Sequence, residues 1–210
     1  MRLYHSPMSI SLACRLALSA GDADYDLVVV NSLAGETKQE PFLSINPLGQ
    51  IPVLECDGVI LTQTVAILSF IAERTGRGWK HATAHDRAKA LSIMVLATVE
   101  VQSAWSMHNR PERFADSAAG RSEVVAHALA RLANAYSEVE RQLGLLAVVP
   151  ELGILDYYLC VFALWKAMVP AANGCAPTPR LDAVKERVMS SPRLQQVIEE
   201  DIASHKARVS

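Results

Sequence analysis

Hydrophobic and polar positions follow two different patterns along the chain, and the first pattern ends near residue 75. Short apolar runs bounded by Gly, Pro, Asp or Asn predict strands, and the last two strands flank Asp57-Gly58, a strong hairpin signal. The predicted strands cover residues 2–4, 25–30, 52–55 and 59–61. Apolar residues at helical spacing predict helices from about residue 9 or 11 to 20 and from 62 to 74, with Gly21 and Gly76 at their ends. A polar stretch after the second strand leads to Phe42-Leu43, where the middle helix falls, and the order β-α-β-α-β-β-α predicts an α/β domain with one small sheet.

The rest of the chain shows helical spacing and no return of strand alternation. The predicted helices cover residues 85–108, 121–143, 154–167, 180–190 and 192–206. A stretch with two Gly and a Trp separates the two patterns and is typical of a linker. We therefore predict an α/β domain over residues 1–76, a linker over 77–83 and an all-helical domain over 84–210.

Charge and cysteine content exclude several classes of protein. Twenty Lys and Arg against 22 Asp and Glu give a net charge of −2, without the basic surplus that follows a phosphate backbone, so we expect no nucleic-acid partner. The longest uncharged runs are shorter than the roughly 18 apolar residues of a membrane span, and the start lacks an apolar signal segment. We expect a cytoplasmic protein without a membrane partner. The four cysteines are far apart and have no histidine at zinc spacing, so we expect no metal.

The segment SINPLGQIPVL at residues 44–54 points to a ligand. Pro52 stands where a strand begins, and it leaves the backbone of Ile51 free to pair with an extended peptide. Ten residues on, Thr64 opens a helix whose first N–H groups could hold a carboxylate. Taken singly, each feature is also explained without a ligand, as an edge-strand proline and a plain helix cap.

Together, N-P-x-G-x-[IV]-P-x-L followed by [EQ]-[ST]-x-A-I-L resembles the N-terminal domain of the glutathione transferases. The resemblance implies a thioredoxin-like domain followed by an all-helical one, glutathione as co-substrate, a role in detoxification and a homodimer. It also implies that the residue before the proline pairs with the cysteinyl backbone of glutathione and that the [EQ]-[ST] pair holds its γ-glutamyl end. The implied glutathione-binding residues are Gln50, Ile51, Pro52, Gln63, Thr64 and, less directly, Lys38.

The helical half extends the resemblance over nearly the whole chain. LGILDYYLCVFALWK is similar to the family's capping motif before a buried helix, with Asp156 at the aspartate and Gly153 where Ser or Thr usually stands. LYHSP near the start and the N-R-P around Arg110 resemble the bacterial beta-type enzymes.

The catalytic group departs from the beta-type pattern. The cysteine of those enzymes is Ile10 here and their histidine is replaced by Gln102, which rules out mixed-disulfide chemistry at position 10. A thiol with a pKa near 8.5 is only a few per cent ionised at neutral pH, so the protein must favour the thiolate. We predict that Ser11, or failing that Ser9, donates a hydrogen bond to it from the start of the first helix, although either could be only a helix cap. His5 is a weaker candidate.

The second substrate is expected to be a small hydrophobic electrophile, bound by apolar and aromatic side chains. The residues predicted to line this pocket are Met8, Trp105, Met107, His108 and Trp165. We therefore predict a glutathione S-transferase that transfers the thiolate onto this electrophile. Two alternatives stay open: a non-catalytic glutathione-binding or scaffold protein, suggested by Ile10 and Gln102, and a glutathione-dependent isomerase or reductase.

Overall fold

The computed structural model describes residues 1–79, 83–146, 151–168 and 175–209. Contacts divide the chain into two units. Unit 1 comprises Met1–His81, Pro150–Val161 and Arg187–Ser210, and unit 2 comprises Ala82–Val149 and Phe162–Glu186. The predicted linker over 77–83 lies partly outside the described residues, and the domain bounds predicted from the sequence stay a prediction.

Unit 1 is built on a four-stranded sheet in the order β2-β1-β3-β4. The strands are β1 (Arg2–His5), β2 (Asp26–Val29), β3 (Val53–Cys56) and β4 (Val59–Thr62). β1 runs parallel to β2 and antiparallel to β3, and β3 and β4 form the predicted hairpin. Asp57 and Gly58 both have positive φ, at 51° and 77°, as the two-residue turn of a right-twisted hairpin requires.

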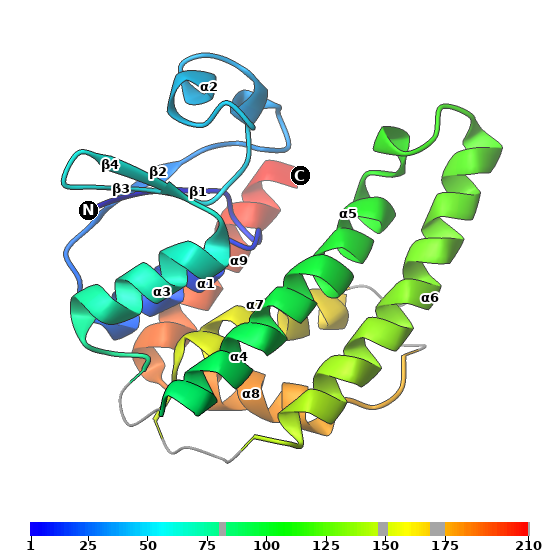
Figure 1. The fold of residues 1–210 in the computed structure, drawn as a ribbon. Helices are drawn as coiled ribbons and strands as arrows, with labels where there is room; N and C mark the ends of the chain where they lie inside the picture. The colour runs from blue at the N-terminus through cyan, green and yellow to red at the C-terminus, as the bar shows by residue number, and fades with distance from the viewer. Residues whose placement is uncertain (80–82, 147–150, 169–174, 210) are drawn as a thin grey trace. The chain divides into compact units, whose positions relative to one another are not determined.

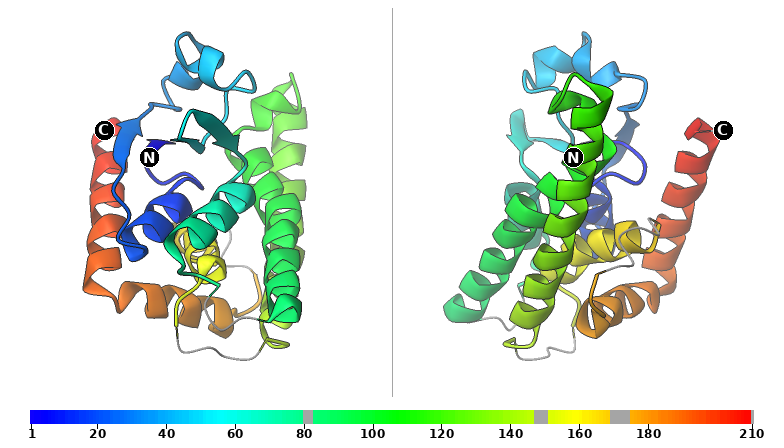
Figure 2. Two further views of the ribbon diagram at one scale, coloured as in Figure 1. Left: turned by 60° about the vertical axis from the view of Figure 1, so that its left-hand side comes forward. Right: turned by 90° about the vertical axis from the view of Figure 1, so that its right-hand side faces the viewer.

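Helices cover both faces of this sheet (Figures 1 and 2). They are α1 (Leu12–Ala20), the short α2 (Phe42–Ile45), α3 (Thr64–Thr75) and α9 (Pro192–Val209). α1 packs between α3 and α9, and α2 lies on the opposite side of the sheet. Side chains alternate along β1, so Tyr4 packs with Phe42 of α2 while Leu3 and His5 point the other way, toward α1.

The start of α7 (Ile154–Met168) confirms the predicted cap. The carboxylate of Asp156 accepts a hydrogen bond of 2.8 Å from the backbone N–H of Gly153 and lies 3.2 Å from the guanidinium of Arg187. Glycine replaces the usual Ser or Thr for a steric reason, since a Cβ at position 153 would lie 2.9 Å from the carbonyl oxygen of Gly78. Burial raises the pKa of Asp156 despite these two contacts.

Unit 2 is helical. α4 (Ala84–Leu96), a π-helical turn η2 (Ala97–Gln102) and α5 (Ser103–Asn109) follow one another and pack along α6 (Ala118–Leu143). α8 (Pro179–Met189) and the second half of α7 also belong largely to this unit. In its core, the indole N–H of Trp105 donates to the Tyr136 hydroxyl at 2.8 Å, which donates to the carbonyl of Phe162 at 2.9 Å. These two hydrogen bonds satisfy the polar atoms of two buried aromatic side chains.

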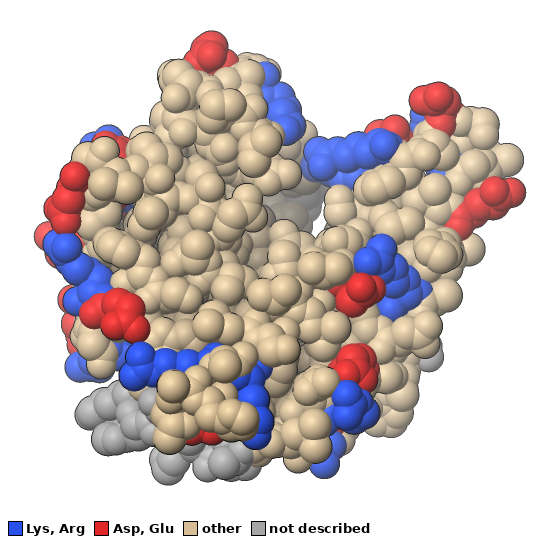
Figure 3. Space-filling model, viewed as in Figure 1, with Lys and Arg blue, Asp and Glu red and all other residues tan. Residues whose placement is uncertain are grey.

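Among the described residues, Ala84–Asn109 is the one helical stretch whose length and composition would suit a membrane span. Met94 and Val101 of this stretch are buried, whereas Val95 and Val99 are about half exposed. A core helix of a soluble protein passes the same test, so this is weak evidence for a membrane. Basic and acidic side chains are interspersed over the face shown in Figure 3, in line with the balanced composition.

The fold class predicted from the sequence is confirmed: a thioredoxin-like βαβαββα unit is followed by helices. Each predicted strand and helix is present within about three residues of its predicted bounds. The pattern did not predict the π-helical turn η2 or the 3-10 turns η1 (Glu36–Lys38) and η3 (Pro111–Arg113).

Candidate active site

One end of the sheet gathers the residues predicted to bind and activate glutathione. Tyr4 of β1 lies opposite Val53 of β3, and Val53 lies opposite Thr62 of β4. The chain after β1, the chain before β3 and the chain after β4 therefore meet at one end of the sheet. α1 and α3 both begin there, so their N-terminal N–H groups face the same region.

The Ile51–Pro52 peptide bond is cis and precedes β3. Ile51 is half-buried, and among the described residues its backbone N–H and C=O have no protein partner. The preceding turn is held by Asn46, whose amide donates to the carbonyl of Gln50 at 2.8 Å. Gly49 has a φ of +58° and no room for a Cβ, which would lie 2.5 Å from the carbonyl of Thr37. An unpaired, fixed backbone edge of this kind can accept an extended peptide.

Lys38 reaches the same turn. Its ammonium donates to the carbonyl oxygen of Leu48 at 2.7 Å, and its side chain is exposed. The structure thereby brings Lys38 close to Gln50, which is also exposed.

Gln63 and Thr64 lie at the start of α3. Gln63 is the N-cap and has a φ of +69°, a left-handed conformation that costs a non-glycine residue about 1–3 kcal/mol. Thr64 is buried, and the first backbone bond of the helix runs from Ile67 N–H to the carbonyl of Gln63. The N–H groups before Ile67 consequently have no partner within the helix, and N–H groups of this kind can bind an anion.

The two candidate serines differ in exposure. Ser11 is 0% exposed, whereas Ser9 is half-buried. The Ser11 Oγ lies 2.7 Å from the Ser9 Oγ, 2.7 Å from His5 Nδ1 and accepts from the Ser6 N–H at 3.2 Å. Ser11 occupies the N-cap position of α1 but its hydroxyl makes no capping bond. The structure thus places Ser11 behind Ser9, in contact with the histidine at the end of β1.

A buried carboxylate from α9 completes this cluster. Asp201 is fully buried, and its Oδ1 lies 2.8 Å from His5 Nε2 and 2.7 Å from Arg15 Nη1. Its Oδ2 accepts a 2.6 Å bond from the backbone N–H of Met8, which has a φ of +56°. The sequence pattern missed Arg15 and Asp201 as site residues, although both are charged side chains at apolar positions of their helices.

The charges in this cluster follow from its burial. Burial lowers the pKa of His5 despite its contact with Asp201, so the imidazole is neutral at neutral pH. Burial acts to raise the pKa of Asp201, but the contacts with His5, the Met8 N–H and Arg15 outweigh it and hold the pKa below its usual value. Asp201 is therefore an anion balanced by the Arg15 cation.

The residues predicted to line the second-substrate pocket fall in both units. In unit 2, the ring of Trp105 lies 5.6 Å from that of His108 and 6.1 Å from that of Trp165, in edge-on contacts. Met107 is half-buried in the same helix, while Met8 belongs to unit 1. A pocket formed by all five residues stays a prediction. Among the described residues, no group of His, Cys, Asp and Glu could hold a metal ion.

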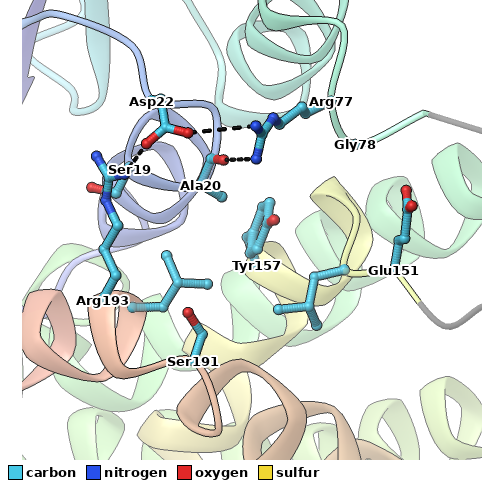
Figure 4. Close-up of a pocket in the computed structure, with 11 residues that line it drawn as sticks. Ser19, Ala20, Asp22, Arg77, Gly78, Glu151, Tyr157, Ser191 and Arg193 are labelled. Carbon is cyan, nitrogen blue, oxygen red and sulfur yellow. Dashed lines mark hydrogen bonds and ion pairs between the residues drawn. The ribbon is translucent and has the colours of Figure 1, made fainter.

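A separate pocket of about 520 Å³ lies within unit 1, at the C-terminal end of α1 (Figure 4). Arg77 and Arg193 flank Asp22 at its edge, and the ring of Tyr157 lines it. Burial raises the pKa of Tyr157 to about 12. α1 has nine residues and so spans about 13 Å, which separates this pocket from Ser9 at the other end of the helix.

Comparisons with known proteins agree with this geometry. Residues 1–73 match the glutathione S-transferase N-terminal domain. A glutathione S-transferase from Hyoscyamus muticus is 35% identical over 103 residues, 49% of each chain, so the chain spans about half the length of the curated relatives it matches. A sphingomonad glutathione S-transferase, solved in complex with glutathione, is 26% identical with a TM-score of 0.76 and covers 96% of this chain and 98% of its own.

A beta-class enzyme from Sphingomonas chungbukensis is 27% identical with a TM-score of 0.68, again over 96% of this chain and 98% of the other. Residues 1–73 therefore belong to the glutathione S-transferase N-terminal domain family, and the chain as a whole has the glutathione transferase fold, with bacterial beta-class enzymes among its structural neighbours.

Proposed function

We propose that this protein binds glutathione at the sheet end described above and transfers its thiolate to a small hydrophobic electrophile. The observation that carries the proposal is the unpaired backbone of Ile51, which lies at the same sheet end as the free N–H groups of α3 and the half-buried hydroxyl of Ser9.

Each part of glutathione has a matching group in this arrangement. The backbone N–H and C=O of Ile51 pair with the cysteinyl residue, as an added strand pairs with a sheet edge. The γ-glutamyl carboxylate binds at the N-terminus of α3, where Gln63 and Thr64 begin the helix. Lys38 and Gln50 meet the glycine carboxylate from the turn before β3.

The chemical step requires an ionised sulfur. Lowering the thiol pKa by two units takes about 2.7 kcal/mol of differential stabilisation, which a helix N-terminus and a hydroxyl can approach together. We assign the contact with the sulfur to Ser9, because Ser11 is buried behind it. The thiolate then attacks the electrophile and forms the S–C bond, while a halide leaves an aromatic carbon or the π bond of an activated alkene opens and takes up a proton.

The proposal extends to a cytoplasmic homodimer that acts in detoxification, which the family resemblance implies. Its test is a calorimetric titration with glutathione, followed on the same sample by the ultraviolet absorbance of the thiolate as a function of pH. Binding with a thiol pKa well below 8.5, and turnover of a hydrophobic electrophile, is the expected result. Binding with an unshifted pKa would instead indicate a non-catalytic homologue, and no binding at millimolar glutathione would refute the assignment.

A panel of substrates separates the remaining alternatives. Conjugation of an aromatic halide or an activated alkene supports the transferase. Turnover of a cis-alkene without net consumption of glutathione would indicate an isomerase. Ser9→Ala is expected to raise the bound thiol pKa and slow conjugation at least tenfold while glutathione still binds, because Ile51 and α3 are untouched.

A further inference from the structure

A continuous buried chain of polar contacts links Ser9 to a carboxylate far along the sequence. It runs from the Ser9 Oγ to the Ser11 Oγ at 2.7 Å, from there to His5 Nδ1 at 2.7 Å, and from His5 Nε2 to Asp201 Oδ1 at 2.8 Å. His5, Ser11 and Asp201 are buried, and only Ser9 is partly exposed. We call these four side chains the relay.

The direction of each hydrogen bond in the relay follows from the charge of Asp201. Nε2 of His5 lies 2.8 Å from the anionic carboxylate without the alignment of a hydrogen bond, but the negative charge still favours the tautomer that carries the proton on Nε2, which leaves Nδ1 as an acceptor. Ser11 must then donate its single hydroxyl proton to Nδ1. The short contact between the two serine oxygens consequently requires Ser9 to donate to Ser11.

In this state Ser9 has no proton left to offer outward. Its oxygen can accept a hydrogen bond from the S–H of bound glutathione, but it cannot donate one to a thiolate. Stabilising the thiolate through Ser9 therefore requires donor and acceptor to exchange in each hydrogen bond from His5 to Ser9. This exchange occurs if Nδ1 of His5 gains a proton, because the imidazolium then donates to Ser11, Ser11 donates to Ser9, and Ser9 donates to the sulfur.

We propose that His5 is the base that takes the thiol proton of bound glutathione, passed to it through Ser9 and Ser11. This inference rests on the proposed function. The S–H bond breaks as its proton goes to the Ser9 oxygen, the Ser9 proton moves to Ser11, and the Ser11 proton moves to Nδ1. The products are a thiolate and an imidazolium, so the total charge and the number of protons are unchanged.

The groups around His5 suit this role. Asp201 from α9 attracts the imidazolium, whereas Arg15 from α1 and Arg208 from α9 oppose it. The imidazole is therefore neutral before glutathione binds, and the thiolate formed at the other end of the relay is the additional anion that favours its protonation. Ser9 alone would touch the sulfur, and His5, Ser11 and Asp201 act through it as positioning residues.

The relay makes a specific prediction about protons. Because His5 keeps the thiol proton, thiolate should form on binding at pH 7 with almost no release of protons to the solvent. If the proton left directly, about one proton would be released for each thiolate formed. Calorimetric titration of glutathione in two buffers with different heats of ionisation measures this release, and ultraviolet absorbance on the same sample counts the thiolate.

Two variants interrupt the relay without creating an unpaired buried charge. In His5→Gln the new amide can accept a hydrogen bond from Ser11 and donate one to Asp201, but it cannot take a proton. In Ser11→Ala the hydroxyl that links Ser9 to His5 is removed. We expect both to bind glutathione, to conjugate at least tenfold more slowly, and to release about one proton for each thiolate that still forms. His127→Gln, which changes an exposed histidine of α6, serves as the control and should behave as the wild type does.

The outcomes distinguish the relay from the proposed function. Thiolate formation with about one proton released in the wild type, or variants that match the wild type in turnover and proton release, would overturn the relay and leave the transferase standing. Glutathione binding without thiolate would overturn both the relay and catalysis. The NMR signal of the His5 ring gives a direct check, since it should change from neutral to imidazolium when glutathione binds, and an unchanged neutral ring beside a thiolate would refute the proposal.

Discussion

The buried pair of Arg15 and Asp201 should matter for stability in an asymmetric way. Their side chains are 10% and 0% exposed and lie 2.7 Å apart. Replacing Arg15 with Met leaves the carboxylate buried without its cation, and breaking such a pair costs about 3–5 kcal/mol. At about 2–4 °C per kcal/mol for a chain of this size, the unfolding temperature should fall by about 6–20 °C.

Removing both charges should recover most of the lost free energy of unfolding. In the double variant Arg15→Met/Asp201→Asn, the amide oxygen can still accept from the Met8 N–H, and no unpaired charge remains. The guanidinium also lies 3.3 Å from Glu200, but that carboxylate is half-exposed, so losing the contact costs about 0–1 kcal/mol. The buried Nε of Arg15 has no hydrogen-bond partner to lose. We expect the double variant to lie within about 2 kcal/mol of the wild type. It should nevertheless lose the proton transfer proposed for His5, because the anion beside His5 is gone.

Urea and thermal unfolding followed by circular dichroism measure these effects, and pH supplies a second check. The folded pKa of Asp201 lies below its ordinary value of 3.8, so the stability it contributes is present above that value and lost as the pH falls through the folded pKa. Without Arg15 the carboxyl protonates at a higher pH, so the gap between wild type and Arg15→Met should narrow on acidification. A single variant that loses less than about 1 kcal/mol, or a double variant as unstable as the sum of the singles, would refute this reasoning.

Three further predictions concern other positions. Gly153→Ser should cost about 1–3 kcal/mol by thermal unfolding, because its Cβ would lie 2.9 Å from the carbonyl of Gly78; an unchanged unfolding temperature would contradict the contact. Gln63→Gly should weaken glutathione binding in calorimetry without lowering the unfolding temperature, because glycine relieves the positive φ; equal affinity would exclude a role for the side chain. Tyr136→Phe should cost about 1–3 kcal/mol in urea unfolding, because the buried indole N–H of Trp105 loses its acceptor; a smaller loss would indicate that another group replaces it.

The elements that were predicted well are those set by local chemistry. Asp57-Gly58 supplies the two positive φ angles of the hairpin, and Gly76, with a φ of +66°, ends α3 as expected. The contact between Asp156 and the N–H of Gly153 joins residues three positions apart, so the sequence pattern can predict it. Such features need no knowledge of the rest of the fold.

The cluster behind Ser9 could not be predicted in the same way. Asp201 follows Leu194, Val197 and Ile198 at helical spacing, so it stands in the apolar stripe of α9, and that misplaced charge was the one local signal. Nothing local indicates that its partner is Arg15, which is 186 residues away. The order of the two serines also depends on tertiary structure, since the left-handed turn at Met8 and the contact with His5 place Ser11 inside.

The segments of unit 1 are far apart in the chain, and this sets the order in which the cluster can form during synthesis. The Met8 N–H is made 193 residues before the carboxylate that it binds. At about 5–20 residues per second, a ribosome needs about 10–40 s to cover that distance. Throughout this interval the nascent chain carries Ser9, Ser11 and His5 without their buried anion, so the cluster is completed only after nearly all residues have been joined.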